Sequence, residues 1–302
     1  MKRIAILILI SSMLPSTFVI LSRAEIPVSE NIQTETGVVF RLLCRAFQPG
    51  EIVRVVMSKD PPVKNAFIRF LGNEYFLSTS GEKWEEQAVI GLDLGLEPGS
   101  YPMKIYVENL NGKWEVINKD IPVLVRKFPV KKLWVEERYV TPPPSVRERI
   151  KGEAEVLNMV YSLVTPHWLA SGNFILPCEG EVFQNFGERR IYNNKPRSSH
   201  SGVDISAPQG EPVKASNSGY VVLANDLYFS GNTVIIDHGL GLFSLYCHLS
   251  KIKVRRGQLV MKGKVIGEVG ATGRVTGPHL HWGIKLQGAR VDPFSLLTLN
   301  FE

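Results

Sequence analysis

Two histidines separated by one residue, in a segment that alternates polar and apolar side chains, constrain this chain more than any other feature. The segment is residues 270–285, GATGRVTGPHLHWGIK. In an extended strand alternate side chains share a face, so His279 and His281 point the same way, about 6.6 Å apart along the backbone. The side chains expected to point into a core are Leu280, Trp282 and Ile284. The pair is either a metal-binding or catalytic pair, or two solvated histidines beside a turn.

A third histidine lies close to a carboxylate in the sequence. His200 stands in SSHSGVDIS, with Asp204 four residues later. A fully extended chain would hold these residues about 13 Å apart, so the segment must bend to bind one ion. Gly202 permits a bend. With His281, these residues would supply two nitrogens and one oxygen, the ligand set of an open catalytic zinc site.

The other three histidines differ in the roles that their surroundings predict. His248 stands in FSLYCHLS, where strict alternation places it on one face with Ser244 and Tyr246. Cys247 then belongs to the opposite face. His248 is therefore a candidate catalytic residue, or a residue that supports the ligands. His238 opens the turn HGLG, where a structural role is expected, and His167 has no partner in the sequence.

The blocks HSGVD, YCHLS and TGPHLHW, in this order, resemble the zinc metallopeptidases of the M23 type, the lysostaphin and LytM group of peptidoglycan endopeptidases. The resemblance implies that zinc binds to His200, Asp204 and His281. It also implies a catalytic pair, His248 and His279, and a substrate groove lined by Tyr246 and Asn185. Cys247 stands where the family usually has a small inert residue, and alternation predicts that it turns away from the groove.

The resemblance implies an exported zinc metalloendopeptidase that hydrolyses the peptide cross-links of peptidoglycan. An alternative from the same family is a non-catalytic LytM-fold protein that binds or activates a cell-wall hydrolase. Such proteins have lost metal ligands, whereas this chain keeps all five positions. A purely structural zinc site is a further alternative, but such a site normally closes with four protein ligands.

Residues 1–24 begin with Lys2 and Arg3, continue as an apolar stretch and end in Ser22, Arg23 and Ala24. This pattern predicts a secretory signal peptide that is cleaved after Ala24, and hence a periplasmic, extracellular or wall-associated protein. The alternative is an uncleaved membrane anchor, which Pro15 disfavours. We expect contact with the membrane only through this segment.

Composition limits the partners of the mature chain. Without the signal segment, the chain has 32 basic and 29 acidic residues, and hence a net charge of +3. This charge does not indicate nucleic-acid binding, although it is compatible with an anionic wall polymer. The 3 cysteines, Cys44, Cys178 and Cys247, leave at least one thiol unpaired, so disulfides are not the main source of stability.

The rest of the sequence predicts a mainly β protein in three parts. Residues 25–130 show short strands separated by turns, among them a hairpin signal at Gly72 and Asn73, and favour an immunoglobulin-like sandwich. Residues 131–170 form a linker with a helix that we expect Ser145 and Glu148 to cap. Residues 171–302 form the LytM-like peptidase domain, an antiparallel sheet of short strands in which the lack of crossover helices excludes parallel βαβ units.

Overall fold

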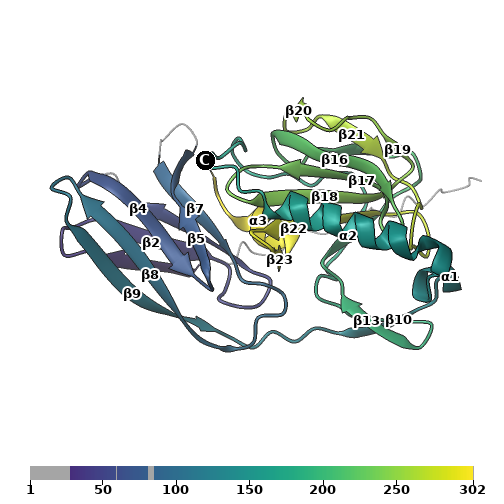
Figure 1. The fold of residues 1–302 in the computed structure, drawn as a ribbon, viewed down its shortest axis with the longest axis horizontal. Helices are drawn as coiled ribbons and strands as arrows, with labels where there is room; N and C mark the ends of the chain where they lie inside the picture. Colours follow the sequence, from purple (N-terminus) through teal and green to yellow (C-terminus); the bar gives the residue numbers. More distant parts are fainter. Residues whose placement is uncertain (1–27, 59, 81–84, 302) are drawn as a thin grey trace, which may run out of the picture.

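The structure, a computed structural model, describes residues 28–58, 60–80 and 85–301. It confirms the expected mainly β fold: strands β1 to β9 form one lobe, and the strands from β11 onward form the other (Figure 1). The predicted signal segment, residues 1–24, lies outside the described residues. Within the described part of the chain, no helix is long and apolar enough to cross a membrane.

The N-terminal lobe consists of two antiparallel sheets, with strand orders β1-β2-β3-β7-β6 and β5-β4-β8-β9 in the described residues. Apolar side chains of both sheets, such as Phe40 and Ile105, meet in one core, so the lobe is a two-layer sandwich. Its immunoglobulin-like character stays a prediction. The strands are β1 Val28–Gln33, β2 Val39–Cys44, β3 Ile52–Met57, β4 Val63–Phe70, β5 Asn73–Phe76, β6 Ser78–Ser80, β7 Glu85–Gly91, β8 Gly99–Asn109 and β9 Trp114–Val123.

The first predicted hairpin is present, but its turn lies one residue earlier than expected. Phe70 pairs with Asn73, so the two turn residues are Leu71 and Gly72. Their φ angles are 49° and 81°, as a turn with two left-handed residues requires. Asn73 is therefore the first residue of β5 and not part of the turn.

The segment between the lobes contains β10 Val130–Leu133, α1 Glu137–Val140, a 3-10 helix at Pro144–Val146 and α2 Arg147–Ser162. The predicted linker helix is α2, but the predicted cap is wrong. The residue before α2 is Val146, and no side chain caps the helix. Ser145 lies inside the preceding 3-10 turn, which Pro144 begins, so it is not at the position of a cap.

Strand β10 was not anticipated as part of a sheet. It pairs in parallel with β12, from Val130 opposite Arg189 to Leu133 opposite Tyr192. The main sheet of the C-terminal part is antiparallel, as expected, and this parallel pair joins β12 to a strand that lies outside that part of the chain. A parallel pair needs a long connection, and here the connection runs through α1 and α2 rather than through a compact crossover unit.

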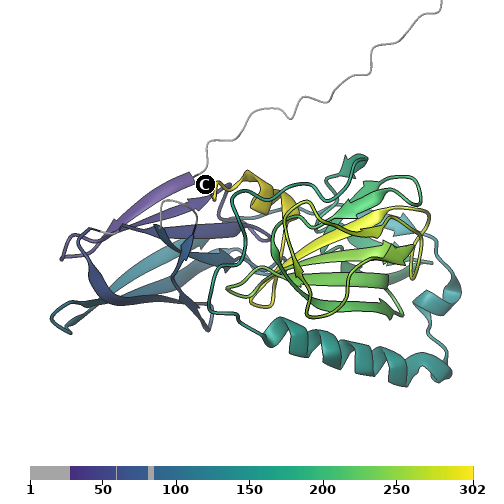
Figure 2. The same ribbon diagram turned by 90° about the horizontal axis from the view of Figure 1, so that it is seen from above.

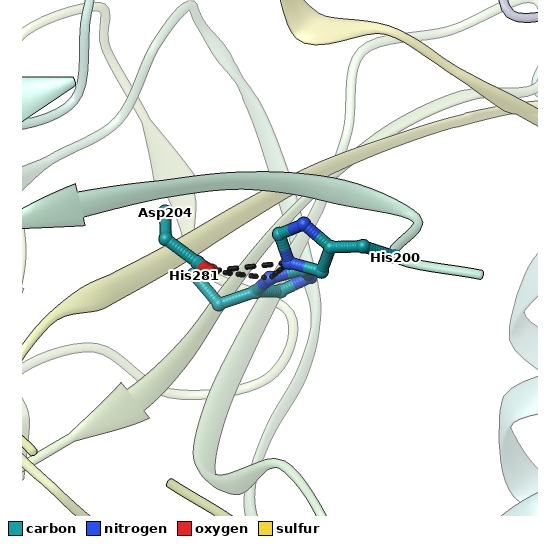
Figure 3. A group of neighbouring side chains, drawn as sticks. All are labelled: His200, Asp204 and His281. Carbon is teal, nitrogen blue, oxygen red and sulfur yellow. Dashed lines mark hydrogen bonds and ion pairs between the residues drawn. The ribbon is translucent and has the colours of Figure 1, made fainter. Parts of the chain in front are cut away.

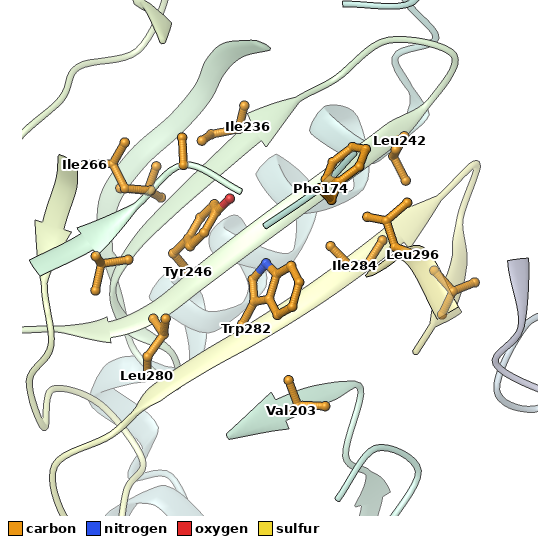
Figure 4. Close-up of a cluster of buried hydrophobic side chains, with 14 of the residues drawn as sticks. Phe174, Val203, Ile236, Leu242, Tyr246, Ile266, Leu280, Trp282, Ile284 and Leu296 are labelled. Carbon is orange, nitrogen blue, oxygen red and sulfur yellow. The ribbon is translucent and has the colours of Figure 1, made fainter. Parts of the chain in front are cut away.

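The C-terminal lobe is built on an antiparallel sheet of order β11-β14-β22-β18-β17-β16-β20, with β23 on β22 and a smaller sheet β15-β21-β19 beside it. One face of the main sheet carries the core, where Trp282 and Tyr246 are fully buried (Figure 4). Helix α2 lies along the other face (Figure 2). The elements are β11 Glu181–Phe183, β12 Arg189–Tyr192, β13 Lys195–Ser199, β14 Gly202–Ser206, β15 Pro212–Lys214, β16 Gly219–Leu227, β17 Gly231–Asp237, β18 Leu242–Leu249, β19 Lys251–Ile252, β20 Leu259–Val260, β21 Val265–Glu268, β22 Leu280–Leu286, β23 Ala289–Val291 and α3 Pro293–Thr298.

Candidate metal centre

Two neighbouring strands bring the three predicted ligands together. In the pair β14 and β22, Asp204 lies directly opposite His281, so both side chains share the face that is turned away from the core. His200 precedes β14 and completes the group. Gly202 makes this approach possible, because a Cβ atom there would lie 2.4 Å from the Trp282 carbonyl oxygen and 2.8 Å from Cε1 of His281.

The three donor atoms form a compact triangle (Figure 3). Nε2 of His200 lies 2.8 Å from Nδ1 of His281, and Oδ1 of Asp204 lies 3.1 Å from each of these nitrogens. Ligands at about 2.0–2.1 Å from a tetrahedral zinc ion are roughly 3.3 Å apart, close to these separations. Two nitrogens and one carboxylate oxygen also match the donor set that zinc prefers, so the residues fit the metal that the resemblance implies.

Backbone carbonyl groups orient three of the four histidines around this triangle. Nδ1 of His200 lies 3.0 Å from the Asn185 carbonyl oxygen, that of His248 lies 2.8 Å from the Thr272 oxygen, and that of His279 lies 2.8 Å from the Gly277 oxygen. A carbonyl only accepts, so each Nδ1 carries the proton and donates it. Each Nε2 therefore keeps its lone pair for a metal, a proton or a substrate.

His248 reaches the site through a β-bulge that strict alternation does not anticipate. Between β17 and β18, Asn232 pairs with Leu249 and Val234 pairs with Tyr246, so Thr233 stands opposite both Cys247 and His248. His248 has φ 64°, in the left-handed region. The extra residue breaks the period of two and directs the imidazole toward His279, with the ring centroids 5.0 Å apart.

The bulge reverses the faces that alternation assigns to the rest of β18, and the prediction that Tyr246 lines the groove is wrong. Tyr246 is fully buried in the core, where its hydroxyl accepts a hydrogen bond of 2.8 Å from Ser216 N. Cys247 stands opposite His281 and therefore shares its face, so the prediction that it turns away is also wrong. Burial raises the pKa of the Cys247 thiol to about 12, so it remains protonated.

Asp204 is held from outside the triangle by two further residues. Nδ2 of Asn185 donates to Oδ2 of Asp204 over 3.0 Å, and Oδ1 of Asn185 accepts from the Asp204 backbone N–H over 3.1 Å. Arg190 of β12 donates to the same Oδ2 over 2.6 Å. Asn185 was expected near the groove. Arg190 was not anticipated, because only the pairing of β12 with its neighbours places it beside Asp204.

Burial determines the charge state of these groups. Burial lowers the pKa of His200, His248, His279 and His281 below the usual histidine value, so the four imidazoles are neutral at neutral pH. Burial alone would raise the pKa of Asp204, but its close contacts with His200 and His281 outweigh this effect and hold that pKa well below its usual range. The site thus combines a carboxylate with neutral imidazoles, the protonation states that metal binding needs.

Two cavities flank the metal triangle. One, of about 230 Å³, is lined by Asp204, His279 and Asn185 together with residues of β10. The other, of about 290 Å³, is lined by His200 and His281 together with residues of α2. His248 borders both cavities. The segment between the lobes therefore contributes to both sides of the candidate site.

The two remaining histidines lie apart from this site, as expected. His238 is fully buried, and its Nδ1 donates to the Ser218 carbonyl oxygen over 2.7 Å. His167 is exposed. The cysteines Cys44, Cys178 and Cys247 are free thiols in the structure.

Comparison with known proteins matches the segment that carries these residues. The profile of peptidase family M23 matches residues 198–293. The peptidoglycan DD-endopeptidase ShyA of Vibrio cholerae is 43% identical over 112 residues, which are 37% of this chain and 26% of that protein. The DD-carboxypeptidase/endopeptidase Mpg of Neisseria meningitidis is 45% identical over 97 residues, 32% of this chain and 22% of that protein. The matched region thus spans about a quarter of these relatives.

A solved structure is similar over a much larger part of the chain. It is a candidate M23 peptidase from Pseudomonas aeruginosa, with 30% sequence identity and a TM-score of 0.64. The similarity covers 83% of this chain and 95% of that structure, and so includes both lobes. Because this likeness extends over nearly all of a related chain, and the family profile falls on the residues of the candidate site, the protein belongs to peptidase family M23.

Proposed function

We propose that this protein is a zinc-dependent endopeptidase that hydrolyses the peptide cross-links of peptidoglycan. The observation that carries the proposal is the open-sided triangle of His200, Asp204 and His281, with two more neutral histidines beside it. A structural zinc site would be closed by a fourth protein ligand, whereas catalysis needs an open position. Family membership and the names of the relatives ShyA and Mpg support this substrate class.

In this proposal His200, Asp204 and His281 hold the zinc ion. Zinc in such a site polarises a scissile carbonyl and lowers the pKa of water. Asn185 and Arg190 orient the Asp204 carboxylate, since both donate to its outer oxygen. This support keeps the inner oxygen, Oδ1, directed at the two imidazole nitrogens.

His248 and His279 act on the reacting groups. Each imidazole is neutral, and each has its Nδ1 proton engaged by a backbone carbonyl, so Nε2 is available to accept a proton from water. The imidazolium formed in this way can stabilise a developing oxyanion. One histidine would serve as the base and the other as the stabiliser of the oxyanion, a role in which its Nε2 must itself carry a proton to donate, and the geometry suits either assignment.

The proposal also extends to the organisation and location of the chain. Residues 1–24 would direct export, and the enzyme would act in the periplasm or at the wall, where its polymer lies. Residues 25–130 form the sandwich, 131–170 the linker and 171–302 the peptidase domain. Because β10 pairs with β12, the start of the linker is also part of a sheet of the peptidase domain.

The decisive experiment compares wild type with His248→Ala and His279→Ala, and uses His167→Ala as the matched control. Purified peptidoglycan is digested, products are identified by mass spectrometry, and zinc is measured in each protein. We expect zinc content to be unchanged and turnover to fall by about 10² to 10⁴ in the two site variants, the usual contribution of a positioned acid or base. His167 is exposed and lies outside the site, so its variant should match wild type.

Two outcomes would contradict this reading. Sugar fragments among the wild-type products would identify a different hydrolase. A wild-type protein that holds zinc and binds peptidoglycan without releasing any product would favour the alternative, a non-catalytic protein that binds or activates a wall hydrolase.

A further inference from the structure

The segment between the two lobes forms one wall of the cavity beside the metal triangle. Strand β10 is fixed there at both ends: Arg189 N donates to the Pro129 carbonyl oxygen over 2.8 Å, and Asn193 N donates to that of Leu133 over 3.0 Å. The side chain of Asn193 also accepts from Val135 N over 3.0 Å and donates to Val135 O over 2.9 Å. β10 is therefore an integral part of the site rather than a loose connection.

The side chains that β10 presents to the cavity follow the period of a strand. Lys131, Leu133 and Val135 all line the cavity of about 230 Å³ that also contains His279 and Asp204. Alternate residues of a strand share a face, so Lys132 and Trp134 point the other way. The wall thus consists of one flexible cation followed by two apolar side chains, and none of these residues lies in the segment that the family profile matches.

Lys131, Arg190 and Arg274 line this cavity, so its charges favour an anionic group in the substrate. Arg274 lies over the Tyr192 ring, 4.6 Å from its centroid. Arg190 is engaged by Asp204 over 2.6 Å and by Glu188 over 3.4 Å, and its side chain is 13% exposed. The side chain of Lys131 is 55% exposed, and its Nζ lies 4.0 Å from Oε1 of Glu188. Glu188 is itself buried, and Arg190 donates to it, so its negative charge is largely balanced.

We infer that Lys131 is a specificity-determining residue that binds a free carboxylate of the substrate peptide, while Leu133 and Val135 contact its small apolar side chains. The identity of the substrate as a wall peptide rests on the proposed function. The contact between Lys131 and a carboxylate does not depend on it. The carboxylate lies on the side of Asp204 and His279, at the cavity that β10 borders. Peptides in which this group is amidated are poorer ligands.

The test uses the full-length protein and two synthetic wall peptides of identical sequence, one with a free terminal carboxylate and one with the carboxamide. Binding is measured by fluorescence polarisation with chelator-treated protein, and turnover is measured with zinc-loaded protein. We expect wild type to bind the carboxylate about three- to fivefold more tightly, as an ion pair partly in water allows. The preference should shrink as salt is added.

Three variants assign the preference to one side chain. Lys131→Gln should bind both peptides equally, and Lys131→Arg should retain the preference. Lys132→Gln is the matched control, because it removes the same charge from the opposite face of the same strand and should behave as wild type. If Lys131→Gln still preferred the carboxylate peptide, the inference would be wrong. It would also be wrong if wild type bound the two peptides equally or bound neither of them.

The two readouts separate the inference from the proposed function. If wild type binds with the expected preference but cuts neither the peptides nor peptidoglycan, the role of Lys131 is supported and the proposed endopeptidase function is wrong. If wild type cuts both peptides with equal efficiency and binds them equally, the proposed endopeptidase function is supported and the inference about Lys131 is wrong.

Discussion

Backbone carbonyl groups, rather than side chains, orient three histidines of the candidate site. The imidazoles of His200, His248 and His279 each donate from Nδ1 to a carbonyl oxygen of a neighbouring loop. The loops therefore determine which nitrogen faces the site. We expect changes in loop conformation to alter the chemistry of these histidines even where no site residue is replaced.

His238 is the residue for which burial makes the clearest prediction about pH. Burial lowers the pKa of His238 from 6.5 to about 4. In the folded protein this imidazole therefore stays neutral at pH values at which it is protonated in the unfolded chain. Above pH 6.5 both states are neutral at this position. As the pH falls from 6.5 to 4, only the unfolded state gains the proton, and about 3 kcal/mol of stability is lost.

The measurement is the free energy of unfolding at several pH values between 7 and about 4 in wild type and His238→Gln. The variant is less stable at pH 7 but should lose less stability on acidification, because it lacks the titrating ring. His167→Gln, at an exposed position, should follow the wild-type curve. Parallel curves for wild type and His238→Gln would show that another group causes the acid sensitivity.

At the level of elements, helix α2 behaves as a layer of the C-terminal lobe rather than as a free spacer. Val160 is 7% exposed and packs with Leu223, Leu227 and Phe243 on the sheet face opposite the main core. The ring of Tyr161 stands edge-on to Phe243, with centroids 5.6 Å apart. A fragment that begins after α2 would expose this apolar face to water, so we expect it to fold poorly.

A pair of neighbouring substitutions in α2 tests this layer. Val160→Ala removes two buried methyl groups and should lower the free energy of unfolding by about 1–2 kcal/mol. Met159 is 62% exposed, so Met159→Ala should change the free energy of unfolding by less than about 0.5 kcal/mol. Chemical denaturation of both variants provides the comparison. Equal effects would mean that α2 does not pack on the sheet in solution.

At the level of the whole molecule, a cluster of four charged residues joins the two lobes. Arg45 contacts Glu51 over 2.7 Å and Asp292 over 2.9 Å, and Arg126 contacts the same carboxylates over 3.2 and 2.7 Å. Both carboxylate side chains are 4% exposed. Ile52 N also donates to Oγ of Ser295 in α3 over 2.8 Å, so the C-terminal helix lies at the same junction.

Removal of one charge from this cluster should weaken the whole protein. Asp292→Asn keeps a side-chain oxygen to accept from Phe294 N at the start of α3 but leaves two arginines with one carboxylate. We expect a loss of about 3 kcal/mol in the free energy of unfolding, as for breaking a buried ion pair. Glu74→Gln, in a pair with side chains 54% and 41% exposed, is the control and should cost less than about 1 kcal/mol. Equal losses in the two variants would show that the cluster does not couple the lobes.

The sequence by itself determined the mainly β fold, the linker helix, the family and the residues that meet at the candidate metal centre. These follow from local periodicity and from short motifs, which the chain carries whatever its tertiary contacts are. Alternation also predicted correctly that His281 faces away from the core that holds Trp282. The same rule failed at Tyr246 and Cys247, because it assumes an unbroken strand.

Only the tertiary structure decided where that assumption breaks and which distant segments border the site. The bulge at His248 depends on how β18 pairs with β17, and a register shift has no signature in the sequence of one strand. The positions of Arg190 beside Asp204 and of Lys131 in the cavity depend on β12 pairing with β10, which is about 60 residues away in the chain. Local patterns specify which face a side chain takes within its own element, whereas the packing of elements far apart in the sequence decides what that face meets.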